Sequence, residues 1–210
     1  MIIQCDFDGT IISNNLSTML RENFADGNWR KIDADYLHCQ LTVERSNQLQ
    51  FAFIREPKEK LQEFARRHIE LRPGFMEFAN YCRDTSTPLV IVSSGLDFYI
   101  EPVLAEIGLP DLEWHCGQTS FSKDGIIVAY YDPEGNSTDE GFKEKYLAWL
   151  KKRDRNVIYI GNGLSDLEAA RHADHVFATG HLLRLLRAES VPATAFTDFH
   201  DIQRQLEHKV

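Results

Sequence analysis

The chain lacks several features that mark whole classes of protein. None of its apolar runs approaches the roughly 18 residues that cross a bilayer, so we expect no membrane-spanning helix and no membrane partner. Basic residues are outnumbered by acidic ones, 23 to 32, and the net charge of −9 argues against nucleic acid as a partner, because its phosphates need a basic face. The first apolar run starts at Ile2, so we expect no signal peptide and a cytoplasmic protein.

Cysteine is sparse as well. The four cysteines are scattered, with no Cys-x-x-Cys pair and no clustered histidine that would complete a zinc site. We expect reduced, mostly packed thiols, and we expect Cys5 to point into the core. What remains is an ordinary globular composition, 43% hydrophobic and 26% charged, with length enough for one full core and a small accessory unit.

The most informative segment is the pentapeptide Asp-Phe-Asp-Gly-Thr at residues 6–10, directly after an apolar, β-prone start. Two carboxylates placed there are expected at the carboxyl edge of a sheet, where open α/β folds bind ligands. Asp6 can then attack a phosphorus while it holds a divalent cation, and Asp8 can protonate the departing alkoxide. The alternative is that Asp-Gly is simply a turn after a strand.

Two further apolar runs end in groups that suit phosphoryl chemistry. Residues 89–95 predict a second buried strand that brings Ser93 to the same edge, where its hydroxyl and free backbone N–H groups would grip a phosphoryl oxygen. Residues 157–166 predict a third strand that breaks into a Gly-rich turn. This turn carries Asn162 and Asp166, whose oxygens suit Mg²⁺.

A lysine lies between these two runs. Phe142-Lys143-Glu144-Lys145 opens a predicted amphipathic helix. Lys143 can neutralise charge on the nucleophile and on the phosphoryl group. Lys145 is the alternative for the same role.

In order and spacing, Asp6-x-Asp8-Gly-Thr, Ser93, Lys143 and Gly161-Asn-Gly-x-x-Asp166 resemble the four motifs of the haloacid dehalogenase-like superfamily. The resemblance covers essentially the whole chain. It implies a phosphatase that works through an aspartyl phosphate on Asp6, with Asp8 as acid and then base. It also implies Mg²⁺ as the cofactor and a small phosphomonoester as the substrate.

The same resemblance implies two sets of binding residues. Mg²⁺ would be held by Asp6, the Asp8 carbonyl, Asn162 and Asp166. The equatorial phosphoryl oxygens would be held by Ser93, Lys143 and backbone N–H groups near Phe7, Asp8 and Ser94.

Alternating strand and helix patterns predict an α/β fold with a doubly wound parallel sheet, like a Rossmann fold. We expect strands at about 2–6, 88–93, 156–161 and 175–178. We expect helices near 74–83, 98–107, 141–152 and 165–173. A further strand pair, 113–117 and 126–131, is joined by the hairpin signal Lys123-Asp-Gly125 at the sheet edge or over the site.

Residues 14–70 break this alternation, because helical periodicity runs through almost all of them. We therefore expect a catalytic core at 1–13 and 71–210, with a helical cap domain at 14–70. In the resembled superfamily, an insert at this point closes over the site and selects the substrate. Such a lid would exclude water during phosphoryl transfer.

The position of the insert narrows the resemblance to the phosphoserine phosphatase-like branch. Phosphoserine phosphatases carry a Glu and a cap Arg that pair the amine and carboxylate of the substrate. Here the aligned positions hold Asn15 and Gln50, so a zwitterionic substrate would lose both charge partners. Asn14, Asn15, Gln50 and Arg45 are polar candidates for facing the substrate, but we expect each of them to be an ordinary solvated cap residue.

A second family in this branch is the 2-hydroxy-3-keto-5-methylthiopentenyl-1-phosphate phosphatase of methionine salvage, whose substrate has no amine. The chain is similar to it around residues 72–78, 94–99, 141–143 and 166–170. These segments do not fix the substrate, because none must touch the variable part of a ligand. Phosphoserine phosphatase and a phosphotransferase or mutase stay open, whereas a dehalogenase is disfavoured because a departing halide needs no proton from Asp8.

The chain departs from the superfamily at one site residue. The fourth motif usually begins Gly-Asp, whereas here it begins Gly161-Asn162. The site loses one negative charge, and we expect weaker metal binding unless Asp166 compensates. A catalytically weak relative that only binds a phosphate ligand is therefore a further alternative. The sequence leaves monomer and homodimer both open.

Overall fold

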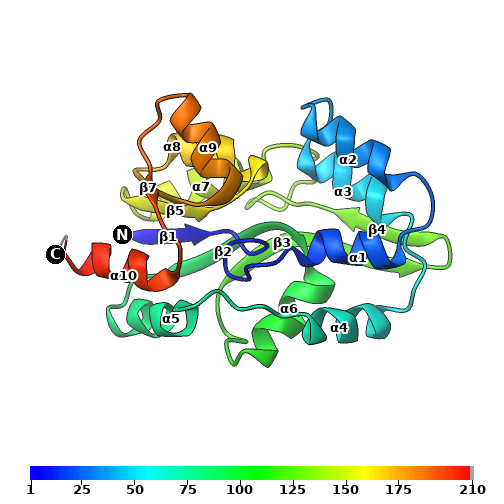
Figure 1. The fold of residues 1–210 in the computed structure, drawn as a ribbon, viewed down its shortest axis with the longest axis horizontal. Coiled ribbons are helices and arrows are strands. Elements are labelled where there is room, and N and C mark those ends of the chain that lie inside the picture. Colours follow the sequence, from blue (N-terminus) through cyan, green and yellow to red (C-terminus); the bar gives the residue numbers. More distant parts are fainter. Residues whose placement is uncertain (209–210) are drawn as a thin grey trace.

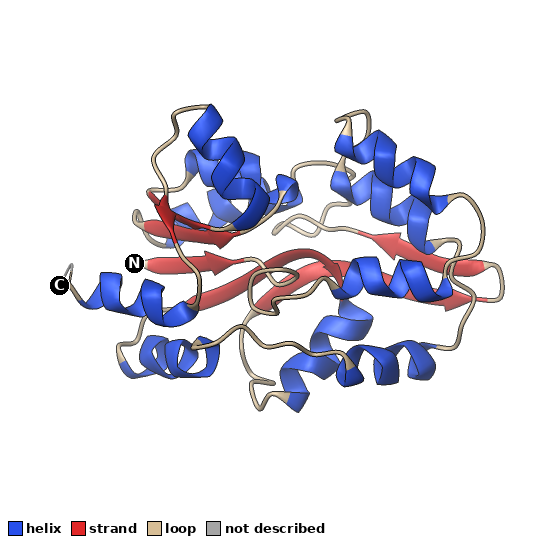
Figure 2. Cartoon of the chain, in the orientation of Figure 1, coloured by secondary structure: helices blue, strands red, loops and turns tan. Residues whose placement is uncertain are grey.

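Seven strands form one sheet in the structure, a computed structural model that describes residues 1–208 (Figures 1 and 2). The order is β4-β3-β2-β1-β5-β6-β7, and every neighbouring pair is parallel except β3 and β4. The strands are β1 (Ile2–Cys5), β2 (Leu89–Leu96), β3 (Trp114–Ser122), β4 (Gly125–Ala129), β5 (Val157–Gly161), β6 (His175–Ala178) and β7 (Thr194–Ala195). This arrangement confirms the predicted α/β fold.

The three central strands are buried along their whole length. β1 pairs with β2 on one side and with β5 on the other, so that Ile3 lies opposite both Leu89 and Ile158. Burial on both faces explains why these strands are mostly apolar runs without polar alternation. Because they are parallel neighbours, their carboxyl ends meet at one edge of the sheet.

Helices cover both faces of the sheet. In Figure 1, α7, α8 and α9 lie on one face, and α5, α6 and α10 lie on the other. Their bounds are α5 (Phe75–Asp84), α6 (Asp97–Glu106), α7 (Phe142–Arg153), the 3-10 turn η1 (Leu164–Asp166), α8 (Leu167–His172), α9 (Gly180–Ala188) and α10 (Phe199–Glu207). No helix within residues 1–208 has the length and apolar character to cross a membrane.

Four helices fill the segment that was expected to be a helical insert. They are α1 (Leu16–Phe24), α2 (Trp29–Leu37), α3 (Val43–Phe51) and α4 (Lys58–Arg67). α2 packs on α3 and α3 packs on β4, whereas α1 packs on α4 and α4 packs on α6. The insert therefore reaches both sides of the sheet at its β4 edge (Figure 1).

Most predicted elements agree with the structure to within a few residues. The hairpin is confirmed at the sheet edge, where Ser122 pairs with Gly125, although β3 runs on to Ser122, beyond the expected end at residue 117. The helix expected near 165–173 is split into η1 and the short α8. The elements α9, β7 and α10 were not predicted.

Candidate active site

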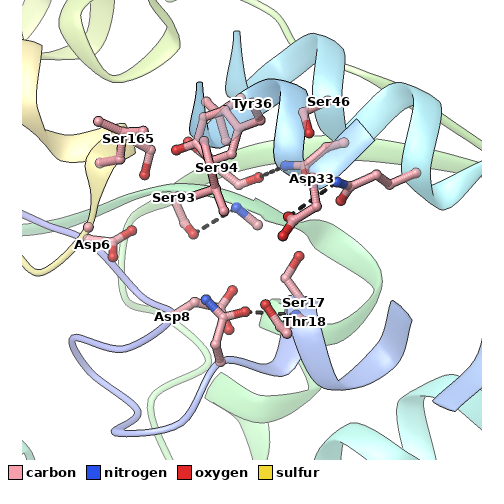
Figure 3. Close-up of a pocket in the computed structure, with 18 of the residues that line it drawn as sticks. Asp6, Asp8, Ser17, Thr18, Asp33, Tyr36, Ser46, Ser93, Ser94 and Ser165 are labelled. Carbon is pink, nitrogen blue, oxygen red and sulfur yellow. Dashed lines mark hydrogen bonds between the residues drawn. The ribbon is translucent and has the colours of Figure 1, made fainter. Parts of the chain in front are cut away.

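Candidate residues meet where β1, β2 and β5 end. Asp6 and Asp8 follow β1, Ser93 lies in β2, and Asn162 follows β5. All four line a cavity of about 260 Å³, whose other wall is built from α1, α2 and α3. Figure 3 shows this hollow, with Asp6, Asp8 and Ser93 on the sheet side. The cavity thus lies between the carboxyl edge of the sheet and the helical insert.

The loop at residues 6–10 has one tightly defined shape. Phe7 O accepts the backbone N–H of Thr10 at 3.2 Å, and Gly9 adopts a φ of +76°. A Cβ at Gly9 would lie 2.1 Å from Asn162 Nδ2. Only glycine therefore lets this loop approach the turn after β5.

Arg72 holds the same loop from outside the cavity. Its guanidinium donates to Thr10 O at 2.7 Å, to Gly9 O at 2.5 Å and to Thr197 O at 3.0 Å. The loop is thus tied to the segment that leads into α10. Sequence reasoning assigned Arg72 no role of its own.

Lys143 and two carboxylates form a buried charged centre. Lys143 Nζ lies 2.6 Å from Asp6 Oδ1 and 2.5 Å from Asp166 Oδ1. The helix α7 starts beside β1, where Gln4 Nε2 donates to Lys143 O at 3.0 Å. Burial by itself would lower the pKa of Lys143, but the charges of Asp166 and Asp6 outweigh it and raise that pKa. The ammonium is therefore a fixed cation.

Asp6 is the member of this centre that faces the cavity. Burial raises its pKa to about 7, the charge of Asp166 adds to the shift, and Lys143 opposes it. Its second oxygen, Oδ2, accepts from Thr10 Oγ1 at 3.2 Å. Asp6 is thus held in place by one cation and one hydroxyl.

Asp166 lies behind Asp6 and is fully buried. Its Oδ1 accepts from Lys143 and from Tyr159 OH at 2.7 Å, and its Oδ2 accepts from Asn162 N and Gly163 N at 2.9 and 2.8 Å. These four donors explain why the chain turns sharply after β5. They also mean that a direct contact between Asp166 and a cation would break an existing bond.

Asp8 is held by neutral donors. Tyr99 OH donates to Asp8 Oδ2 at 2.6 Å, and Leu16 N donates to Oδ1 at 2.7 Å. A Cβ at Gly95 would lie 2.3 Å from Tyr99 OH, so glycine leaves room for this bond. Burial raises the pKa of Asp8, and the two hydrogen bonds offset part of that shift. A raised pKa suits a group that must deliver a proton.

Two serines of β2, Ser93 and Ser94, line the cavity. Ser93 Oγ accepts from Gly95 N at 2.9 Å, which leaves the Ser93 hydroxyl proton free to donate elsewhere. Ser94 O accepts from Asn47 Nδ2 at 2.8 Å and from Tyr130 OH at 2.6 Å. Ser94 Oγ is buried without a partner among the described residues.

The side-chain oxygens of Asp6 and Asn162 at the sheet edge are of the chemical type that binds Mg²⁺. Thr10 Oγ1 lies 3.2 Å from Asp6 Oδ2 and 3.1 Å from Asn162 Oδ1, so two candidate ligand oxygens converge on one hydroxyl. Carboxylate and amide oxygens are ligands that Mg²⁺ prefers. Within residues 1–208, no group of three or more His, Cys, Asp and Glu side chains is arranged to hold a metal ion. A site here therefore depends on Asn162 and on backbone carbonyls.

The expectation for the insert residues was partly wrong. Gln50 was expected to be solvated, but it is 1% exposed and lines the cavity, because α3 turns this face toward the sheet edge. Asn15 also lines the cavity while its side chain caps α1. Arg45 is exposed as expected, and the half-buried Asn14 donates to His68 O. Arg21 and Asp33, which also line the cavity, were not singled out from the sequence.

Comparisons with known proteins agree with this geometry. A phosphatase of Bacillus pumilus, strain SAFR-032, named 2-hydroxy-3-keto-5-methylthiopentenyl-1-phosphate phosphatase, is 28% identical over 98% of this chain and 90% of its own length. A protein of the same name from Bacillus cereus, strain AH187, is 29% identical over 97% of this chain and 94% of its own length.

A solved structure shares the fold. A substrate-bound phosphoserine phosphatase complex superposes with a TM-score of 0.71 at 18% identity, and the match covers 97% of each chain. The family model for haloacid dehalogenase-like hydrolases matches residues 3–171, which include all four predicted motifs. The chain therefore belongs to the haloacid dehalogenase-like hydrolase family.

Proposed function

We propose that the chain is a Mg²⁺-dependent phosphatase that hydrolyses the phosphomonoester of a small metabolite. The observation that carries this proposal is that Asp6, bonded to the fixed cation of Lys143, and Asp8, held by neutral donors, face one cavity. Two carboxylates in such different surroundings suit a nucleophile and a general acid. The phosphatase names of the full-length relatives support the same chemistry.

In the proposed reaction, Asp6 attacks the phosphorus in line and forms an aspartyl phosphate while the ester oxygen departs. Asp8 gives its proton to that oxygen. Asp8 then takes a proton from the water that attacks the aspartyl phosphate, which frees inorganic phosphate and restores Asp6. The raised pKa of Asp8 supports the first of its two roles.

Other residues are proposed to hold the phosphoryl group. Lys143, Ser93 and the backbone N–H groups near Phe7, Asp8 and Ser94 would bind its equatorial oxygens, where charge develops in the transition state. The partnerless Ser94 hydroxyl supports this placement.

Asp6, Asn162 and the Asp8 carbonyl are the residues that we propose to hold Mg²⁺, with Asp166 behind them. When bound, the ion supplies charge neutralisation for the phosphoryl oxygens. Asn162 in place of a carboxylate makes weaker metal binding an expected property of this chain.

The helical insert at residues 14–70 is proposed to act as the cap. Its helices α1, α2 and α3 form one wall of the cavity, so closure there would exclude water from the site. The first substrate to test is the enol phosphate of methionine salvage, because the relatives are named 2-hydroxy-3-keto-5-methylthiopentenyl-1-phosphate phosphatase.

The experiment is phosphate release from a panel of phosphomonoesters by purified protein with Mg²⁺. The panel includes p-nitrophenyl phosphate, phosphoserine, sugar phosphates and a ketose or enol phosphate. Release that a chelator abolishes supports the proposal. A phosphorylated isomer in place of free phosphate would identify a mutase, and silence across the panel with an intact fold would favour a relative that only binds phosphate ligands.

A further inference from the structure

The cavity wall opposite Asp6 carries a polar cluster that the proposed phosphoryl transfer does not use. It consists of Arg21 on α1, Asp33 on α2 and Gln50 on α3, and we call these three residues the insert cluster. Arg21 is 7% exposed, and the side chain of Asp33 is 37% exposed. A charged pair and an amide are thus placed where the rest of a bound phosphomonoester would lie.

Arg21 is surrounded mainly by neutral acceptors. Its guanidinium donates to Ser17 Oγ at 3.0 Å, to Thr18 Oγ1 at 3.1 Å and to Asn47 Oδ1 at 3.3 Å. Its nearest acidic oxygen is Asp33 Oδ1, at 3.9 Å. The cation is therefore balanced in charge by Asp33, although the two groups do not make a close hydrogen bond.

Hydrogen bonds are missing at this end of the cavity. Gln50 Nε2 donates to Asp33 Oδ1 at 3.3 Å, but Gln50 Oε1 is buried without a partner among the described residues. Arg21 Nε is in the same condition. Buried polar groups without partners cost free energy, and both residues line the cavity. A ligand with its own polar groups is the simplest source of the missing bonds.

We propose that the insert cluster recognises a neutral, oxygen-rich leaving group, a short chain with hydroxyl or carbonyl oxygens. This inference rests on the proposed phosphatase function. An acidic leaving group would meet Asp33, and an ammonium would meet Arg21, so the balanced pair favours neither single charge. A zwitterion would have to displace the neutral acceptors of Arg21 and the amide that Gln50 donates to Asp33. A plain alkyl chain would desolvate the cluster and return no hydrogen bond, which lowers its binding in the transition state.

A matched four-carbon series tests the proposal: erythritol phosphate, butyl phosphate and phosphoerythronate. The wild-type protein is expected to show a kcat/KM for erythritol phosphate about a hundredfold above that for butyl phosphate. Gln50→Leu is expected to reduce this ratio about tenfold, whereas Gln48→Leu on the same helix leaves it unchanged. A wild-type ratio near one, or a ratio that Gln50→Leu does not change, would overturn the proposal.

A second variant tests the charge argument without a large change in shape. Asp33→Asn removes the acid that faces Arg21, so kcat/KM for phosphoerythronate is expected to rise about tenfold relative to erythritol phosphate. The control is Asp35→Asn on the same helix, which does not line the cavity. An unchanged preference in Asp33→Asn would overturn the charge argument.

The experiments distinguish a failure of the specificity proposal from a failure of the proposed phosphatase function. A wild-type protein that releases phosphate from p-nitrophenyl phosphate and from butyl and erythritol phosphates alike would overturn the specificity proposal and leave the phosphatase standing. A protein that releases phosphate from no compound overturns both.

Discussion

Lys143 Nζ lies 2.6 Å from Asp6 Oδ1, and neither side chain is more than 6% exposed. The same ammonium also binds Asp166, which is fully buried. A single cation therefore stabilises two carboxylates that are almost wholly buried. Removing it leaves buried negative charges without a partner, which is costlier than losing a surface ion pair.

Lys143→Met is expected to lower the free energy of unfolding by about 3 kcal/mol near neutral pH. The loss should be larger near pH 8 than near pH 5. The pKa of Asp6 is already raised above its unfolded value, and without Lys143 it rises further, so stability falls as pH increases through that range. Denaturant unfolding at the two pH values, in a chelator, measures this difference.

The control for that prediction is Lys145→Met, on the same helix and exposed. It is expected to change the free energy of unfolding by less than about 0.5 kcal/mol. Equal losses in the two variants would contradict the role given to Lys143 and reopen Lys145 as the alternative.

Tyr99→Phe removes the hydroxyl that donates to Asp8 Oδ2 at 2.6 Å. We expect kcat to fall about tenfold with little change in KM, because Tyr99 orients the proton donor and touches no substrate. Steady-state kinetics measure the two constants separately. The control is Tyr131→Phe, a partly exposed tyrosine outside the cavity. A kcat within twofold of wild type would argue against this role of Tyr99.

Arg72→Gln tests whether the loop at residues 6–10 needs support from outside the cavity. Three carbonyl groups lose their donor, and we expect a loss of about 2 kcal/mol in unfolding free energy together with a lower kcat. The exposed Arg66 provides the control, as Arg66→Gln. A normal kcat in a destabilised Arg72→Gln protein would limit Arg72 to a purely structural role.

The cysteines give a prediction about reactivity. Burial raises the pKa of Cys82 to about 12 and raises the pKa of Cys5 and Cys116 well above the usual value, whereas Cys39 is exposed. Only thiolates react readily with alkylating reagents. Near pH 8 the native protein is therefore expected to lose one thiol to iodoacetamide, at Cys39, and four after unfolding. Peptide mass spectrometry identifies the sites, and rapid native modification of Cys5 would contradict the packing of β1.

Much of the fold was predictable because its strands are short, buried and strongly apolar. The apolar runs that begin at Ile2, Leu89 and Val157 have no simple interpretation other than buried strands, and three of the family motifs lie at their ends. The C-terminal helices were missed although signals were present. Leu182 and Leu186 have helical spacing in α9, and Asp198 begins α10 with a capping box.

The rest of the site was not predictable because its contacts join distant parts of the chain. Tyr99 reaches Asp8 across 91 residues, and Arg72 reaches Gly9 across 63. Neither has a spacing pattern that points to its partner. Gln50 was misjudged although a signal was present, since its position aligns with the cap Arg that pairs the substrate in phosphoserine phosphatases, and the structure places it in the cavity wall.

The central claim is that Asp6 is the nucleophile of a Mg²⁺-dependent phosphatase. The most direct measurement compares phosphate release by the wild-type protein and by Asp6→Asn, at equal concentration, with circular dichroism to verify the fold of both. The account predicts Mg²⁺-dependent release by the wild type and none above background by the variant. A folded Asp6→Asn protein that keeps even about a tenth of the wild-type rate would contradict it.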